Sequence, residues 1–128
     1  MPLRIWDECD VLVAGGGTAG VIAAVAAART GARTRLVEQS GIVGGTAVTA
    51  VQPLIAFHDN ANRQIVGGVG WELAQRLLKM GAAAHTINDV ETEGAYSRGG
   101  TNYTLRKISY HPEALKYVCF EMLEEAGV

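Results

Sequence analysis

The first part of the chain alternates between short apolar runs, glycines and charged residues. Residues 10–14 read Asp-Val-Leu-Val-Ala and stop at Gly15, which predicts a strand buried on both faces. Residues 18–29 are rich in alanine and contain no proline, so we expect a helix, with Gly31 placed to end it in the left-handed conformation. Residues 33–38 supply Thr34, Leu36 and Val37 as a second strand, which ends at Glu38. Together these segments predict a βαβ unit of about 30 residues.

The pattern is less regular further along the chain. Residues 47–57 are apolar but broken by Pro53, which predicts an irregular segment. Residues 71–80 have the spacing of a short amphipathic helix. Residues 85–107 are mostly polar and contain turn signals, so we expect a loop or a short hairpin there.

The last segment predicts the clearest amphipathic helix, over residues 111–127. Pro112 suits its first turn, Gly127 ends it, and apolar residues recur between them at spacings of three and four. Such a stripe is expected to lie on a sheet and to lead into a further parallel strand. We therefore expect the sheet of this chain to be incomplete.

Composition narrows the class of protein. The chain has 128 residues, 48% of them apolar and 19% charged, which is typical of a folded domain. A net charge of −2 disfavours a nucleic-acid-binding surface. Two cysteines, Cys9 and Cys119, are too few for a disulfide framework or a cysteine-only metal cluster, and no histidine has a metal-ligand spacing, so no metal site is expected.

An uncharged stretch over residues 11–28 raises the question of a membrane span. It contains four glycines and many alanines, whose small side chains contribute little transfer energy into lipid, so a span is not expected. The preceding residues 1–10 carry more acidic than basic charge, which disfavours a secretory signal. The default expectation is a cytoplasmic location without membrane attachment.

The glycine excess points to a specific chemistry. Glycine accounts for 16 residues, well above the usual share of about 7%. The segment Gly15-Gly16-Gly17-Thr18-Ala19-Gly20 fits G-x-G-x-x-G, in which the glycines allow a tight turn, close approach of a diphosphate, and close helix packing. Glu38 follows Gly20 by 18 residues, near the spacing at which an acid accepts hydrogen bonds from a ribose. These features predict dinucleotide binding.

A second glycine pair favours FAD over NAD. An NAD domain of the usual kind would continue after Glu38 with a crossover helix and a third strand. Here Gln39 to Val43 leads instead to Gly44-Gly45 and a long irregular stretch. A glycine pair can lay its backbone amides against a bulky cofactor. An NAD-binding dehydrogenase module remains the alternative.

These motifs resemble the N-terminus of the FAD-dependent oxidoreductase superfamily with a glutathione-reductase-type Rossmann domain. Three later segments resemble the branch related to the flavin subunit of heterodisulfide reductases: Phe57-His58-Asp59, Gln64 to Gly68, and His111 to Lys116. The resemblance covers almost the whole chain but only the opening part of such a protein. It implies an enzyme in which a bound flavin transfers hydride or electron pairs.

The resemblance also assigns the expected site. Gly15, Gly17, Gly20 and Glu38 would hold the diphosphate and the adenosine ribose, with Gly44 and Gly45 beside the diphosphate and the flavin. The full expected cofactor-binding set is Gly15, Gly16, Gly17, Thr18, Ala19, Gly20, Glu38, Gln39, Gly44, Gly45 and Thr46. His58 is the one weak candidate for a catalytic role, and the substrate is unknown.

The expected organisation is a single α/β unit with a Rossmann-like start. Residues 9–45 form the dinucleotide-binding core, residues 46–110 an irregular insertion, and residues 111–127 a docking helix. A partner chain or a further C-terminal segment would complete the sheet. The non-enzyme alternative is a fragment that holds no cofactor until the sheet is completed.

Overall fold

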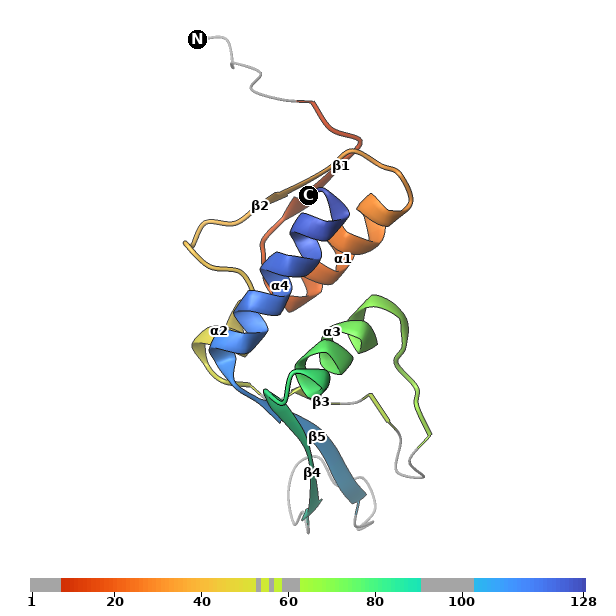
Figure 1. The fold of residues 1–128 in the computed structure, drawn as a ribbon, viewed down its shortest axis with the longest axis vertical. Coiled ribbons are helices and arrows are strands. Elements are labelled where there is room, and N and C mark those ends of the chain that lie inside the picture. The colour runs from red at the N-terminus through yellow and green to blue at the C-terminus, as the bar shows by residue number, and fades with distance from the viewer. Residues whose placement is uncertain (1–7, 53, 56, 59–62, 91–102) are drawn as a thin grey trace.

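The chain folds as an α/β structure with two small sheets and a group of packed helices (Figure 1). The structure is a computed structural model that describes residues 8–52, 54–55, 57–58, 63–90 and 103–128. In order, its elements are β1 (Val11–Ala14), α1 (Thr18–Arg29), β2 (Thr34–Val37), α2 (Thr46–Thr49), β3 (Leu54–Ile55), α3 (Gly68–Lys79), β4 (Ala83–Val90), β5 (Tyr103–Tyr110) and α4 (Pro112–Ala126).

The predicted βαβ start is confirmed. β1 and β2 pair in parallel, with Val11 opposite Thr34 and Ala14 opposite Val37, and α1 connects them. After α1 the backbone of Gly31 has a φ of +91°, the left-handed conformation expected at the end of that helix. The parallel sheet has two strands among the described residues, as expected for an incomplete Rossmann-like sheet.

The segment between residues 46 and 110 is more regular than the sequence analysis expects. It contains α2, α3 and an antiparallel sheet with the strand order β3-β5-β4. β4 and β5 form the expected hairpin, with strands of eight residues each, and Ala83 lies opposite Tyr110. β3 pairs with β5 through Leu54 opposite Ile108. This last pairing joins residues far apart in the sequence, so local periodicity did not reveal it.

Helix α3 begins three residues before its predicted start at Trp71. Gly68 and Gly70 lie in its first turn although glycine is a poor helix former. Gly70 is buried, and a Cβ placed on it would lie 3.5 Å from the side chain of Ile22 in α1. Packing against α1 therefore overrides the local preference.

The hydrophobic core lies mainly between helices. Its fully buried large side chains come from α1, α3 and α4: Val21, Val25, Leu73, Leu77, Leu115, Val118, Cys119 and Met122. The expectation that the last helix docks on a sheet needs correction, because α4 packs mainly on α1, α2 and α3. Two strands of four residues span only about 13 Å, whereas a helix of this length spans about 22 Å. No helix among the described residues has both the length and the apolar character needed to cross a membrane.

The parallel sheet is covered on one face. Val13 and Leu36 point inward and pack against the helical core. On the outer face Leu12 and Val37 are 63% and 60% exposed. In Figure 1 this sheet lies at the same end as the C-terminus, and the β4–β5 hairpin projects from the opposite end.

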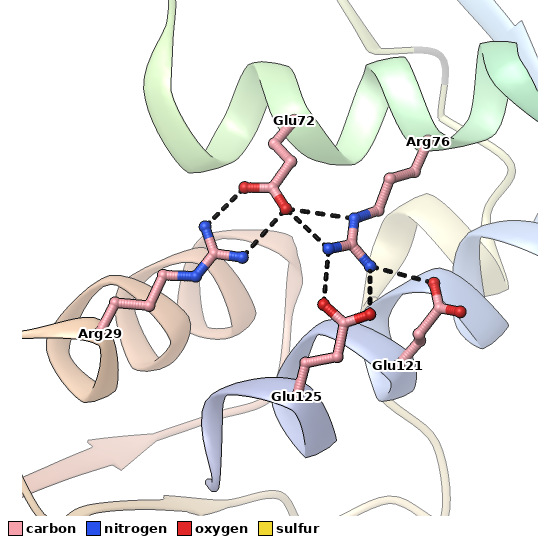
Figure 2. A network of polar contacts seen from close by, with 5 residues as sticks. All are labelled: Arg29, Glu72, Arg76, Glu121 and Glu125. Carbon is pink, nitrogen blue, oxygen red and sulfur yellow. Dashed lines mark hydrogen bonds and ion pairs between the residues drawn. The ribbon is translucent and has the colours of Figure 1, made fainter.

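An ion-pair network fastens α3 to α1 and α4 (Figure 2). Glu72 of α3 accepts two hydrogen bonds from Arg29 of α1, at 2.5 and 2.9 Å. Arg76, one turn further along α3, contacts Glu72 at 2.8 Å and reaches α4 at Glu125 (2.6 Å) and Glu121 (3.1 Å). One side of α3 is thus tied to both neighbouring helices.

The network shifts the ionisation of its members. The guanidinium of Arg29, followed by that of Arg76, lowers the pKa of Glu72 from 4.5 to about 2, against the opposing effect of burial. Hydrogen bonds to Glu125, and then to Glu72 and Glu121, raise the pKa of Arg76. Glu72 and Arg76 are therefore charged at neutral pH, and their ion pair is intact there.

Candidate functional site

The strand-to-helix turn forms the first part of the site. β1 ends at Ala14, and Gly15, with a φ of +106°, donates its amide to the carbonyl of Val37 at 2.7 Å. The first intrahelical bond of α1 is donated by Val21 to the carbonyl of Gly17 at 2.9 Å. The amides of residues 18–20 therefore have no acceptor in their own helix, and no side chain caps this end. Such a helix end attracts an anion.

Gly20 allows the helix to lie directly against the turn. A Cβ placed on Gly20 would be only 1.9 Å from the carbonyl oxygen of Gly15. No other amino acid fits at this position without moving the helix or the strand end. The third glycine of the motif therefore has the packing role that the sequence predicts.

The outer side of the same turn is open. A Cβ placed on Gly15 or on Gly17 would meet no atom within 4 Å. Bare backbone beside open space, next to an uncapped helix end, is the shape that a diphosphate requires. The residues present here fit a dinucleotide.

The glycine pair Gly44-Gly45 lies against this turn. The amide of Gly44 donates to the carbonyl of Gly16 at 2.8 Å, and the hydroxyl of Thr18 donates to the carbonyl of Gly44 at 3.2 Å. A Cβ placed on Gly45 would be 2.9 Å from the Cα of Gly17. Both members of the pair have positive φ, +102° and +55°. Close approach and backbone conformation together explain why two glycines stand here.

Glu38 is held at the end of β2 by hydrogen bonds from two sides. Its Oε2 accepts the amide of Gly16 at 2.6 Å, and its Oε1 accepts the amide and the hydroxyl of Ser40 at 2.8 and 2.9 Å. The Ser40 amide, then the Gly16 amide and the Ser40 hydroxyl, lower the pKa of this carboxyl. A hydrogen bond from the Gln39 backbone lowers this pKa further. These bonds hold the carboxylate in its charged form at the end of β2, beside the glycine turn.

Most of the expected site residues meet at this place, but their roles differ. Gly16 uses both its amide and its carbonyl within the protein, so it builds the site and leaves its neighbours to face the ligand. Ala19 in the first turn of α1, Gln39 after β2, and Thr46 at the start of α2 are exposed. The contact of any of them with a cofactor stays a prediction.

Ser40 is the residue that sequence reasoning missed. It orients the Glu38 carboxylate through its amide and its hydroxyl, and it shares its single hydroxyl proton between that carboxylate and the carbonyl of Ile42 at 2.9 Å. The signal was local, because a serine two residues after an acid can bond to it across a tight bend.

His58 lies in a ring cluster of the insertion. Its imidazole centroid is 5.3 Å from the ring of Trp71 and 6.4 Å from that of His85, and Trp71 also contacts Phe57 at 5.3 Å. These contacts give His58 a packing role against α3. A catalytic role for it stays a prediction.

Comparison with known proteins decides the family. A model of the family described as FAD dependent oxidoreductase matches residues 10–128, almost the entire chain. The chain belongs to the FAD dependent oxidoreductase family. The cofactor of this family is FAD, as the glycine pair predicted, and the open turn fits the diphosphate of that dinucleotide.

Three curated relatives match a shorter stretch of this family member. Leghemoglobin reductase of Glycine max is 50% identical over 40 residues, or 31% of this chain and 8% of that protein. Mitochondrial dihydrolipoyl dehydrogenase of Pisum sativum is 48% identical over 40 residues, with the same shares. The alpha subunit of sarcosine oxidase of Rhizobium meliloti (strain 1021) is 44% identical over 43 residues, or 34% of this chain and 4% of that protein.

These matches are partial. Each spans less than a tenth of the relative's length. No solved structure matches the chain.

Proposed function

We propose that this chain binds the ADP half of FAD at the glycine turn, as part of a flavin-dependent oxidoreductase whose substrate is unidentified. The diphosphate lies over Gly15 and Gly17 at the start of α1, and Glu38 accepts a hydroxyl of the adenosine ribose. Gly44 and Gly45 border the diphosphate. Thr18, Ala19, Gln39 and Thr46 line the same site in this proposal.

The arrangement of Glu38 carries the proposal. Its carboxylate is ionised and held from two sides beside an open glycine turn. A hydroxyl donor suits this carboxylate, whereas the phosphate of a 2′-phosphorylated nucleotide would be repelled by its negative charge. The family match supports FAD as the dinucleotide.

The chemistry of the complete enzyme comes from the flavin, which accepts and donates hydride or electron pairs when bound. In this proposal the glycine turn and Glu38 bind the cofactor and orient it. The uncapped end of α1 offers its amides to the diphosphate without needing a lysine, so a chain with a net charge of −2 can hold this anion.

A finer assignment rests on the sequence alone. We propose the branch related to the flavin subunit of heterodisulfide reductases, because of the segments Phe57-His58-Asp59, Gln64 to Gly68, and His111 to Lys116. A requirement for a thiol or disulfide substrate in the protein expressed from its complete reading frame would support that branch.

The test of FAD binding compares two dinucleotides. The protein is expressed from its complete reading frame, and its melting temperature is measured with FAD or NAD added separately. FAD at about 100 times its Kd is expected to stabilise the protein by about 2.7 kcal/mol. Flavin absorbance should also remain after desalting.

A matched variant links the binding to the site. Glu38→Gln keeps the size of the side chain but removes its charge, so it should weaken FAD binding about tenfold through the lost charged hydrogen bond. Glu113→Gln, on the exposed side of α4, is the control and should bind FAD like the wild type. Stabilisation by NAD alone would contradict the proposal and favour a dehydrogenase module.

A further inference from the structure

The hydroxyl of Tyr110 joins the antiparallel sheet to the segment that follows the glycine pair. Tyr110 is the last residue of β5, and its phenol oxygen lies 2.7 Å from the carbonyl oxygen of Ala47. It also lies within hydrogen-bond distance of the carbonyl oxygen of Gln52. Both partners are acceptors, so the phenol acts as the donor and shares its single proton between them. Burial raises the pKa of Tyr110, which keeps that proton in place.

The clamped segment contains a strained residue. Val51 has a φ of +50°, the one non-glycine residue with positive φ in the described part of the chain. A β-branched side chain is strongly disfavoured in this conformation, and such strain persists only where the surroundings impose it. The two carbonyls held by Tyr110 lie on either side of Val51. The hydroxyl of Tyr110 thus holds the chain on both sides of the strained residue.

The strained segment is directly continuous with the proposed cofactor site. Gly45 is the residue before α2, and a Cβ placed on it would be 2.9 Å from the Cα of Gly17. Helix α2 leads through Ala50 into Val51. Val51 and Tyr110 also line a cavity of about 220 Å³ together with Lys107 and Ser109. A ligand that extends from the diphosphate along residues 46–52 would lie against the segment that Tyr110 holds.

We infer that Tyr110 is a positioning residue for the flavin half of the cofactor, acting through residues 46–52. The inference rests on the proposed function, because it requires the diphosphate to lie at the glycine turn. The adenosine half is held by Gly15 to Gly20 and Glu38, which Tyr110 does not contact through its hydroxyl. Loss of the clamp should therefore affect the two halves of FAD differently.

The test compares FAD with ADP, which contains the adenosine and diphosphate alone. In the protein expressed from its complete reading frame, Tyr110→Phe should weaken FAD binding about fivefold to tenfold, since the binding-competent shape of residues 46–52 becomes less populated. ADP binding should stay within about twofold of the wild type. The visible absorption bands of bound flavin should also shift, which a purely structural loss would not cause.

Tyr117→Phe is the matched control. Tyr117 lies on α4 and is 60% exposed, so removal of its hydroxyl should change neither FAD nor ADP binding. It applies the same chemical change as Tyr110→Phe at a site away from the clamp.

A second substitution tests the mechanism of the clamp. Asparagine adopts positive φ more readily than valine, so Val51→Asn should let the segment keep its shape without Tyr110. In the Val51→Asn background, Tyr110→Phe should change FAD affinity by less than about twofold. Should Tyr110→Phe alone fail to fold, the double variant is expected to fold and to bind FAD like the wild type.

Three results would overturn the inference. The first is FAD binding that is unchanged by Tyr110→Phe. The second is an equal loss of FAD and ADP binding, which would indicate general destabilisation. The third is a double variant that binds FAD poorly while it binds ADP normally. If the wild type binds neither ligand, the proposed function itself fails, and the inference fails with it.

Discussion

Substitution of Gly20 by alanine tests the packing of the glycine turn. The added Cβ would lie 1.9 Å from the carbonyl oxygen of Gly15, whereas a comfortable contact between a carbon and a carbonyl oxygen is about 3.3 Å. The helix start and the strand end must therefore separate by more than about 1 Å. Core residues Val21, Ala24 and Val25 follow on the same helix and would be shifted with it.

The expected cost of Gly20→Ala is that of overpacking a well-packed interior, about 1–3 kcal/mol. For a chain of this size that corresponds to a fall in melting temperature of about 4–12 °C. Thermal unfolding followed by circular dichroism, without cofactor, measures it directly. FAD binding should fall as well, because the turn is distorted.

Gly17→Ala is the matched control for this prediction. Gly17 has a φ of −63°, which alanine adopts freely, and an added Cβ meets no atom within 4 Å. The unfolding free energy without cofactor should therefore change by less than about 0.5 kcal/mol, while the new methyl group occupies space needed by the diphosphate and weakens FAD binding. Equal melting temperatures for the two variants would refute the reasoning from the turn geometry.

Three further predictions concern the helices. Arg76→Met should lower the unfolding free energy by about 1–2 kcal/mol in urea titrations, because it leaves carboxylates of α3 and α4 without their shared partner. Substitution of an exposed lysine on the same helix, Lys79→Met, should change it by less than about 0.5 kcal/mol, and similar losses for both variants would contradict a role for the network. The pKa of Glu72 is lower in the folded than in the unfolded protein, so the stabilisation that its carboxylate provides is present above pH 4.5 and is lost as the pH falls toward about 2. Urea titrations between pH 6 and pH 2.5 should show a loss of about 1–2 kcal/mol, a value reduced for the 30% exposure of this carboxylate, and the loss should be smaller in Glu72→Gln. Cys119 is buried and burial raises the pKa of its thiol to about 11, so a thiol reagent at pH 8 should modify Cys9 first and Cys119 only after denaturation; rapid labelling of both in the folded protein would count against this packing.

The first three elements of the fold could be predicted from the sequence because the patterns that predict them are local. The strand before Gly15, the helix over residues 18–29 and the strand before Glu38 follow one another without a break, and each has its own periodicity or propensity. The packing role of Gly20 and the position of Glu38 beside the turn also follow from spacing within this unit. The prediction of FAD needed one more local feature, the glycine pair at Gly44.

The structure of the middle of the chain was harder to predict because it depends on contacts between residues that are distant in sequence. Leu54 pairs with Ile108, and the predicted start of α3 was wrong because Gly70 packs on α1. The prediction that α4 packs on a sheet was wrong for a related reason. An apolar stripe shows that a helix is buried but not what covers it, and here other helices cover most of it.

The sequence by itself therefore determined the βαβ start, the dinucleotide motif and the choice of FAD, since each depends on residues close together along the chain. Tertiary structure decided how that motif is supported: Gly16 bonded to Glu38, Gly45 against Gly17, and Tyr110 bonded to the carbonyls of Ala47 and Gln52. These contacts join segments whose separation in sequence carries no periodic signal. Their geometry exists only once the helices have packed and brought the segments together.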